Sequence, residues 1–330
     1  MSSSAGEASL QISPGISTIR EAQKYLAKYF APTRLVAAPY LSAAAGKNVY
    51  LKLETELPTS SFKVRGAFWA LGQRMSRESV REVVASSTGN HGAAVAYAAK
   101  QFALKAKIFL PTNCNPVKLG RIASFGAAIV ESGGGDLASA YALAAEYAKQ
   151  PGVYFLNDAT DPDLPAGPAT IGCEILEQLP KTHAIFVPMG DTALIRGIAA
   201  AVKPIATHVK IVGVQAERAP SYYLSWKEGK VVGTESCDTI ADGLATRTPE
   251  AANVRDVKNL VDEVVLVSEE EMLRAIEVLL LEEHVLAEPA GAASTAALLK
   301  SGTSHGDDVV LVVSGANISR EVLRRAVAHA

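Results

Sequence analysis

Strand-like and helix-like segments alternate along almost the whole chain. Short apolar runs bounded by turn residues have the composition of buried strands, and alanine-rich or periodic segments follow most of them. The predicted strands are residues 82–86, 106–110, 127–130, 153–155, 184–187, 209–214 and 308–313, and the predicted helices are 93–101, 116–125, 136–149, 170–178 and 192–206. Repeated strand–helix units with short connections predict an α/β fold with mostly parallel sheets.

The length and composition are those of a large globular protein. The chain has 330 residues, of which 48% are hydrophobic, enough for a sizeable core. This length exceeds that of most single domains, so one large domain or two intimate ones are expected. No repeat, low-complexity block or linker divides the sequence, and we therefore expect any two domains to be interleaved.

Charge, hydropathy and cysteine content exclude several classes of function. The formal net charge of −2 gives no electrostatic reason to expect a nucleic acid or an anionic membrane as partner. The apolar runs are too short for a transmembrane helix, and residues 1–10 have neither the basic start nor the apolar core of a secretory signal. Cys114, Cys173 and Cys237 are widely spaced and match no metal-ligand pattern. The sequence therefore predicts a protein of the reducing cytoplasm.

A polar turn at residues 86–92 follows one predicted strand and precedes a helix. Ligands of parallel sheets bind beyond the carboxyl ends of the strands, so chemistry is expected at such turns. The hydroxyls of Ser87 and Thr88 and the backbone near Gly89 are suited to a carboxylate, and Asn90 is suited to a phenolate-type oxygen. The alternative is a serine or threonine that caps the helix without a ligand.

A second strand–turn–helix junction lies at residues 187–194. Gly190 turns the chain, and the exposed amides at the start of the next helix are suited to a phosphate group. Asp191 is unfavourable beside a phosphate unless it is turned away or paired. The alternative interpretation makes Asp191 the N-cap of the helix.

Two further positions could carry chemistry. Lys63 lies in the hexapeptide Ser61-Phe62-Lys63-Val64-Arg65-Gly66, next to an aromatic ring, and lysine amines form Schiff bases with carbonyl cofactors. Ser314 ends the last strong strand, where a hydroxyl can bond to a pyridine nitrogen or cap a helix.

The glycine-rich turn at 133–136 lacks the spacing of a dinucleotide or P-loop site. Among the six histidines only His91, inside the first polar turn, has functional weight.

Lys63, the Asn90 turn and the Ser314 turn, in this order and spacing, resemble the fold-type II pyridoxal-phosphate enzymes. The resemblance covers about residues 39–319 and is greatest for the serine/threonine dehydratase and serine racemase branch. His91 favours this branch, because cysteine-synthase-like relatives usually have threonine there. The segments that fit the branch are 52–54, 61–66, 239–245 and 288–292.

The resemblance implies a fold and a set of roles. The fold would be tryptophan synthase beta-like, with two open α/β domains: residues 1–70 and 160–330 as a large cofactor-binding domain, and 71–159 as a small domain with the carboxylate turn. Lys63 would be the Schiff-base lysine and the base at Cα. The other residues implied at the cofactor, pyridoxal 5'-phosphate, are Phe62, Asn90, Gly190, Asp191, Thr192, Ala193, Leu194, Gly243 and Ser314. Those implied at the substrate carboxylate are Ser87, Thr88, Gly89 and His91.

The chain departs from this branch in two places. The branch usually has four glycines in the phosphate turn, whereas this chain has Gly190-Asp191-Thr192-Ala193. Related enzymes often bind a divalent cation through acidic residues after the strand that ends near Val214. Gln215 and Ser221 stand there instead, so no metal is expected.

The expected activity is that of a pyridoxal-phosphate-dependent ammonia-lyase. A β-hydroxy amino acid such as L-threonine or L-serine would give a 2-oxo acid and ammonia, and the protein would be a homodimer. A hydroxyl at Ser314 would leave the pyridine largely neutral, which favours elimination over transamination. A racemase or β-replacement synthase on the same scaffold, with Thr88 as an acid at Cα in a racemase, stays open. So does a binding protein without catalysis.

Overall fold

The computed structural model describes residues 13–87, 89–112, 116–133, 137–301 and 304–328. Its strands form two sheets, and strand order and direction confirm the expected α/β class with mostly parallel pairing. The strands are β1 (Leu35–Ala37), β2 (Asn48–Leu53), β3 (Glu82–Ser86), β4 (Lys105–Leu110), β5 (Ala128–Glu131), β6 (Val153–Phe155), β7 (Ala184–Pro188), β8 (Lys210–Ala216), β9 (Glu263–Val267) and β10 (Asp308–Val313). Thr88, Cys114, residues 134–136 and His329 lie outside the described residues, so the expectations that concern them stay predictions.

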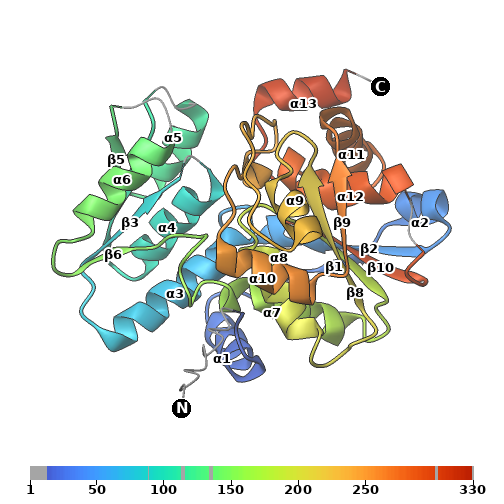
Figure 1. Ribbon diagram of the computed structural model, residues 1–330, viewed down its shortest axis with the longest axis horizontal. Helices are drawn as coiled ribbons and strands as arrows, with labels where there is room; N and C mark the ends of the chain where they lie inside the picture. Colours follow the sequence, from blue (N-terminus) through green and yellow to red (C-terminus); the bar gives the residue numbers. More distant parts are fainter. Residues whose placement is uncertain (1–12, 88, 113–115, 134–136, 302–303, 329–330) are drawn as a thin grey trace, which may run out of the picture.

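Most helices alternate with these strands, as Figure 1 shows. The helices are α1 (Ile16–Leu26), α2 (Pro39–Ala45), α3 (Lys63–Arg77), α4 (Asn90–Gln101), α5 (Pro116–Ser124), α6 (Leu137–Tyr147), α7 (Ala166–Gln178), α8 (Ala193–Val202), α9 (Ser221–Glu228), α10 (Ala251–Leu260), α11 (Glu269–Leu281), α12 (Pro289–Ser301) and α13 (Arg320–Val327). Helices α9 and α10, like α11 and α12, follow one another without a strand between them. Helix α4 begins at Asn90, three residues before the predicted start, so Asn90 and His91 are helical rather than part of the turn.

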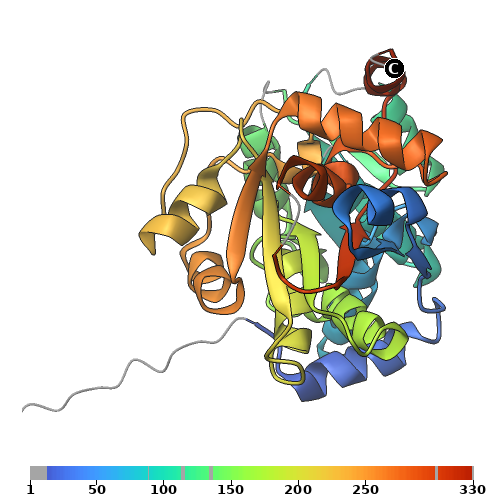
Figure 2. The same cartoon turned by 90° about the vertical axis from the view of Figure 1, so that its right-hand side faces the viewer.

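The larger sheet has six strands in the order β1-β2-β10-β7-β8-β9. Only β1 is antiparallel to its neighbour, and the strands from β2 to β9 run parallel. Alternate residues of the central strands face opposite ways, as strand geometry requires. Val309 and Leu311 pack with helices α11 and α12, whereas Val310 and Val312 pack with α7, α8 and α10. Figure 2 shows these helices on both faces of the sheet.

The smaller sheet has four parallel strands in the order β5-β4-β3-β6. Val83 and Ala85 on one face pack with α3 and α4, and Val84 on the other face packs with α6. All four strands lie between residues 82 and 155, while the larger sheet takes strands from both sides of this segment. The domain boundaries themselves stay a prediction.

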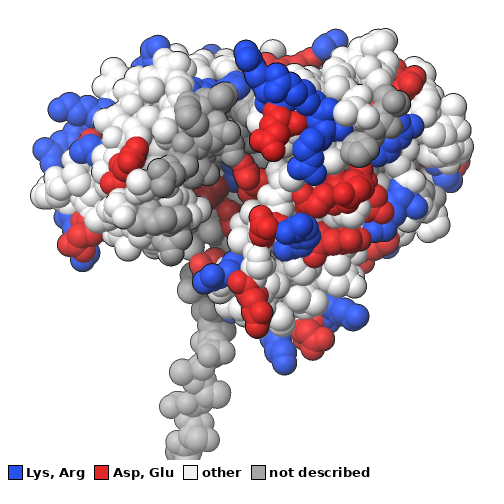
Figure 3. Space-filling view, turned by 90° about the horizontal axis from the view of Figure 1, so that it is seen from above, with Lys and Arg blue, Asp and Glu red and all other residues white. Residues whose placement is uncertain are grey.

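The carboxyl ends of strands from both sheets meet near the middle of the molecule. The turns after β3, β7 and β10 carry the residues near Ser87, Gly190 and Ser314, which are far apart in sequence. No described helix is both long and apolar enough to cross a membrane. On the face seen in Figure 3, acidic and basic side chains are interspersed.

Candidate active site

A cavity of about 380 Å³ lies where the two sets of strand ends meet. Its volume is within the range of about 300–1,000 Å³ that is usual for small-molecule sites. The sequence-predicted site residues that line it are Phe62, Lys63, Ser87, Gly89, Asn90, His91, Gly190, Asp191, Thr192, Ala193, Leu194, Gly243 and Ser314. The fold therefore brings together all predicted site residues that the structure describes.

Lys63 is fixed at the first turn of α3 by contacts with the end of β10. The amide of Phe62 donates to the carbonyl oxygen of Ser314 at 3.0 Å, and Ser61 forms an isolated antiparallel bridge with Gly315. Because this backbone pairing joins the Lys63 turn to the Ser314 turn, the two side chains enter the cavity from a common rigid base. The Lys63 ammonium also lies 5.4 Å from the centre of the Phe62 ring.

The Lys63 side chain is mostly buried and forms an ion pair with Asp158. Lys63 Nζ donates to Asp158 Oδ2 at 2.6 Å. Burial opposes the charged ammonium, but the carboxylates of Asp158 and Asp191 outweigh it and hold the pKa of Lys63 above its ordinary value. Burial likewise opposes the Asp158 carboxylate, but His91 and Lys63 outweigh it and hold its pKa well below the usual range.

Asp158 is a residue that sequence reasoning missed. It follows β6 and lies at the carboxyl end of that strand, where the rule for parallel sheets places ligand-binding residues. This position could have identified it. Arg121 was also missed: its guanidinium Nη2 donates to Ser60 Oγ at 3.0 Å, and its side chain lines the cavity.

His91 is buried on the wall of the cavity. Its Nε2 lies 2.9 Å from the carbonyl oxygen of Leu156, and since that oxygen can only accept, Nε2 carries a proton. Its other ring nitrogen, Nδ1, is 3.9 Å from Asp158 Oδ2 and has no hydrogen-bond partner among the described residues. Nε2 of His91 is thus bonded to the backbone, whereas Nδ1 faces Asp158 in the cavity.

Asn90 is held by two neighbours at the same end of the cavity. Its Nδ2 donates to Glu288 Oε1 at 2.5 Å, and Asn317 Nδ2 donates to its Oδ1. A Cβ at Gly315 would lie 2.3 Å from Glu288 Oε1, so a larger residue there would displace this carboxylate from its position beside Asn90. The second hydrogen of the Asn90 amide stays available for a ligand in the cavity.

The turn at residues 190–194 has the geometry of an anion site. A Cβ at Gly190 would lie 2.0 Å from the carbonyl oxygen of Gly243, so the two glycines bring two backbone segments into direct contact. The first amides of α8 have no intrahelical acceptor and point out of the helix start. Thr192, with φ of 70°, is the N-cap, and no side chain caps the helix. Asp191 is therefore not the cap that the alternative interpretation made it.

Asp191 is turned toward a neighbouring segment. Its Oδ1 accepts a hydrogen bond from Thr246 Oγ1 at 2.9 Å. Burial, and next the nearby Asp158 carboxylate, raise the pKa of Asp191 above its ordinary value. Beneath the turn, the buried Arg196 donates from Nε to Thr192 Oγ1 at 3.0 Å and pairs with Asp256 at 3.3 Å.

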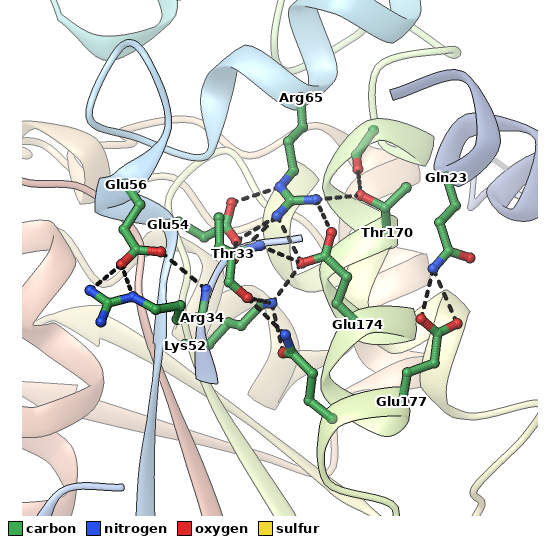
Figure 4. A network of polar contacts seen from close by, with 12 residues as sticks. Gln23, Thr33, Arg34, Lys52, Glu54, Glu56, Arg65, Thr170, Glu174 and Glu177 are labelled. Atoms are coloured by element: carbon green, nitrogen blue, oxygen red, sulfur yellow. Dashed lines mark hydrogen bonds and ion pairs between the residues drawn. The ribbon is translucent and has the colours of Figure 1, made fainter. Parts of the chain in front are cut away.

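A buried polar network supports the helix that carries Lys63 (Figure 4). Arg65 Nε donates to Glu54 at 2.8 Å and its Nη1 to Glu174 at 2.5 Å, while Lys52 Nζ donates to Glu174 at 2.6 Å. Two cations and two carboxylates thus balance one another inside the protein, which makes their burial tolerable. The network joins β2, α3 and α7 below the cavity.

The residues present fit pyridoxal phosphate. The cavity offers a buried lysine, an aromatic ring beside it, a hydroxyl at Ser314 and a helix start for a phosphate. The described residues hold no group of three or more His, Cys, Asp or Glu side chains suited to a metal ion. Gln215 Oε1 instead accepts from the amide of Tyr223 at 2.8 Å, and the absence of a metal stays a prediction.

Comparison with known proteins gives the same assignment. The chain is 37% identical over 309 residues to the L-threonine ammonia-lyase of Thermotoga maritima, covering 94% of this chain and 77% of that protein. It is 32% identical over 306 residues to the catabolic L-threonine dehydratase of Escherichia coli, and the match covers 92% of this chain and 93% of that protein.

Solved structures also superpose on the chain. Maize serine racemase has a TM-score of 0.90 at 28% identity and covers 96% of this chain and 98% of its own. The processed form of threonine deaminase isoform 2 from Solanum lycopersicum has a TM-score of 0.89 at 30% identity. The match covers 100% of this chain and 90% of that one. The family model described as pyridoxal-phosphate dependent enzyme matches residues 26–315. The chain is therefore a member of this family of pyridoxal-phosphate-dependent enzymes.

Proposed function

We propose that this protein is an ammonia-lyase that converts a β-hydroxy amino acid, such as L-threonine or L-serine, to a 2-oxo acid and ammonia. The observation that carries the proposal is the meeting of Lys63, the carboxylate turn and the phosphate turn in one cavity. Two relatives that match more than 90% of this chain are named for ammonia-lyase or dehydratase activity on L-threonine, which supports this substrate class.

The cavity residues have roles suited to this reaction. The amides of residues 190–194 would hold the cofactor phosphate, with Gly243 packed beneath them. Asn90 would contact the phenolic oxygen, and the Ser314 hydroxyl would donate a hydrogen bond to the unprotonated ring nitrogen. Ser87, Gly89 and His91 would bind the substrate carboxylate.

Lys63 would hold and move the proton at Cα. When bound, pyridoxal phosphate withdraws electrons from Cα and so makes its proton acidic. Once displaced by the substrate amine, the Lys63 amine would accept that proton as general base. Phe62 and the Ser314 backbone limit where the amine can move, because both fix the start of α3.

The proposal is tested by product and by attachment site. Purified protein with pyridoxal phosphate should release 2-oxo acid and ammonia from L-threonine or L-serine in equal amounts. Borohydride reduction of the loaded protein, followed by peptide mapping, should label Lys63. Label on another lysine would contradict the assignment of Lys63, and a Lys63→Ala variant is the matched negative control.

A racemase is the second candidate, because a solved structure named serine racemase superposes on almost the whole chain. Chiral analysis of serine recovered from the same incubation separates the two. Formation of D-serine without 2-oxo acid would favour the racemase, and a new β-substituted amino acid in the presence of a thiol would favour a β-replacement synthase.

We also propose a cytoplasmic homodimer with the domain division expected from the sequence. The thiols of Cys173 and Cys237 are free, which is in keeping with a reducing compartment. Size-exclusion chromatography with light scattering measures the molar mass of the protein and so tests the dimer. A single species with the mass of one chain would contradict it.

A further inference from the structure

One carboxylate in the cavity is in direct contact with the proposed base. Asp158 Oδ2 lies 2.6 Å from Lys63 Nζ, and its side chain is only 17% exposed, on the wall of the cavity. Its position between Lys63 and His91 suits it to accept and donate a proton.

The proposed dehydration needs a proton at a second place. Hydroxide is a poor leaving group, so a β-hydroxyl leaves readily only when a proton reaches its oxygen. Lys63 gains a proton when Cα loses one, and that proton has to leave Lys63 before the next turnover. Asp158 is hydrogen-bonded to the same nitrogen.

We propose that Asp158 passes the proton taken by Lys63 to the departing β-hydroxyl, so that water leaves. This inference rests on the proposed dehydratase function and adds a catalytic acid to it. The Cα–H bond breaks and an N–H bond forms on Lys63. The proton then moves along the hydrogen bond to Asp158, and from Asp158 to the β-oxygen as the Cβ–O bond breaks. Lys63 ends as a neutral amine and Asp158 as a carboxylate, so charge and protons balance without another reactant.

Two other acidic side chains on the cavity wall are less suited. Asp191 accepts a hydrogen bond from Thr246, and Glu288 accepts one from Asn90. Among the described residues, Asp158 is the carboxylate that bonds to Lys63 directly. His91 faces Asp158 at 3.9 Å, too far for a hydrogen bond but near enough to stabilise its charge.

Burial favours the proton transfer within this pair. A separated ammonium and carboxylate are costly in a dry cavity, whereas a neutral amine beside a carboxylic acid is less so. When Lys63 is neutral, its share in lowering the pKa of Asp158 is lost, while burial still raises that pKa and His91 still lowers it. In the resting protein Asp158 is therefore a carboxylate. During the reaction it can accept the proton that Lys63 has taken from Cα.

The test uses two substrates that differ only in the leaving group. β-Chloro-L-alanine and L-serine give the same 2-oxo acid, but chloride leaves without a proton. In the cofactor-loaded Asp158→Asn variant, kcat/KM for L-serine should fall by about 100-fold or more, the usual contribution of a general acid. The loss on β-chloro-L-alanine should be at least about tenfold smaller, since chloride leaves without a proton and the amide keeps the shape of the side chain. Asp158→Glu should recover part of the activity on L-serine.

Controls separate a lost acid from a damaged site. The variant's melting temperature and its affinity for pyridoxal phosphate, followed by absorbance, should match those of wild type. Asp163→Asn removes an acid that pairs with the exposed Arg77 at 2.7 Å, and it should leave both substrates unaffected. Equal losses on both substrates would show that Asp158 only positions Lys63, and no loss on L-serine would show no role; either result overturns the inference.

The same assay distinguishes failure of the function from failure of the inference. Wild-type protein that releases 2-oxo acid from β-chloro-L-alanine but from neither L-serine nor L-threonine is not a dehydratase, and both proposals then fail. Wild-type protein that dehydrates L-serine, with an Asp158→Asn variant that does so equally well, refutes the inference alone.

Discussion

The guanidinium group of Arg65 holds the Glu174 carboxylate by two hydrogen bonds, 2.5 Å from Nη1 to Oε1 and 2.9 Å from Nη2 to Oε2 (Figure 4). Arg65 is two residues beyond Lys63 on α3, and Glu174 is on α7. This pair therefore fixes the helix of the proposed base against the body of the larger sheet. Both side chains are buried, and burial opposes their charges, but each holds the pKa of the other toward its charged form.

Replacing Arg65 by Met should destabilise the protein severely. Glu54 and Glu174 would stay buried with only Lys52 to balance them, and breaking such a pair costs about 3–5 kcal/mol. Chemical denaturation measures the loss. The control is Arg77→Met, at an exposed position on the same helix, α3, where the arginine pairs with Asp163. It should lower the free energy of unfolding by less than about 1 kcal/mol. Similar losses in both variants would contradict a special role for the buried network.

Gly190→Ala should impair both stability and cofactor binding. The added methyl group would lie 2.0 Å from the Gly243 carbonyl oxygen, and forced overpacking costs about 1–3 kcal/mol or more. The matched control is Gly120→Ala on α5, where no described atom lies within 4 Å of an added methyl group. That change should be neutral or stabilise by about 0.5–1 kcal/mol. Melting curves with and without pyridoxal phosphate report both effects, and equal curves for the two variants would refute the packing argument.

Asp191→Gly should leave the affinity for pyridoxal phosphate equal or higher. The backbone amides of the turn supply the donors, and removal of a carboxylate lowers the repulsion of the phosphate. Titration followed by absorbance gives the dissociation constant. Affinity lower by more than about tenfold, or 1.4 kcal/mol, would mean that the carboxylate bonded to Thr246 organises the turn.

Asp191 should also make the stability of the cofactor-free protein depend on pH. Its folded-state pKa is raised, so the folded protein binds this proton more tightly than the unfolded chain does. The resulting penalty is absent below the unfolded pKa of about 3.9 and grows as the pH rises through the folded pKa. Asp191→Asn, which can still accept from Thr246, should thus raise the melting temperature at neutral pH and lose this advantage in acid. A gain that is the same at every pH would exclude ionisation as its cause.

Thr88→Ala addresses the racemase alternative. Thr88 lies outside the described residues, so its role rests on the sequence alone. If its hydroxyl returns a proton to Cα, the variant loses racemisation and Cα deuterium exchange of a D-substrate but keeps elimination of the L-substrate. If Thr88 only caps the helix, stability falls by about 1 kcal/mol and both activities change together. Wild-type protein without detectable racemase activity would also exclude the acid role.

Several features of the fold followed from the sequence because they depend on local pattern. The runs at 82–86 and 308–313 consist of strand-forming apolar residues beside turn residues, and they coincide with β3 and β10. The predicted helix at 192–206 ends earlier, at Val202 of α8. The pattern gave no prediction for β1, whose three residues are too few to show a period.

The sequence by itself determined which turns are expected to hold chemistry, since glycine, hydroxyl and lysine positions at strand ends are local facts. Only the tertiary structure decided what lies beside them. Asp158 lies 95 residues after Lys63 in the sequence. The two meet because the turn after β6 and the start of α3 converge on one cavity. The direction of Asp191 was likewise set by Thr246, a residue that no spacing rule connects to it. Long-range packing places such partners, and a linear pattern does not encode the distances that packing creates.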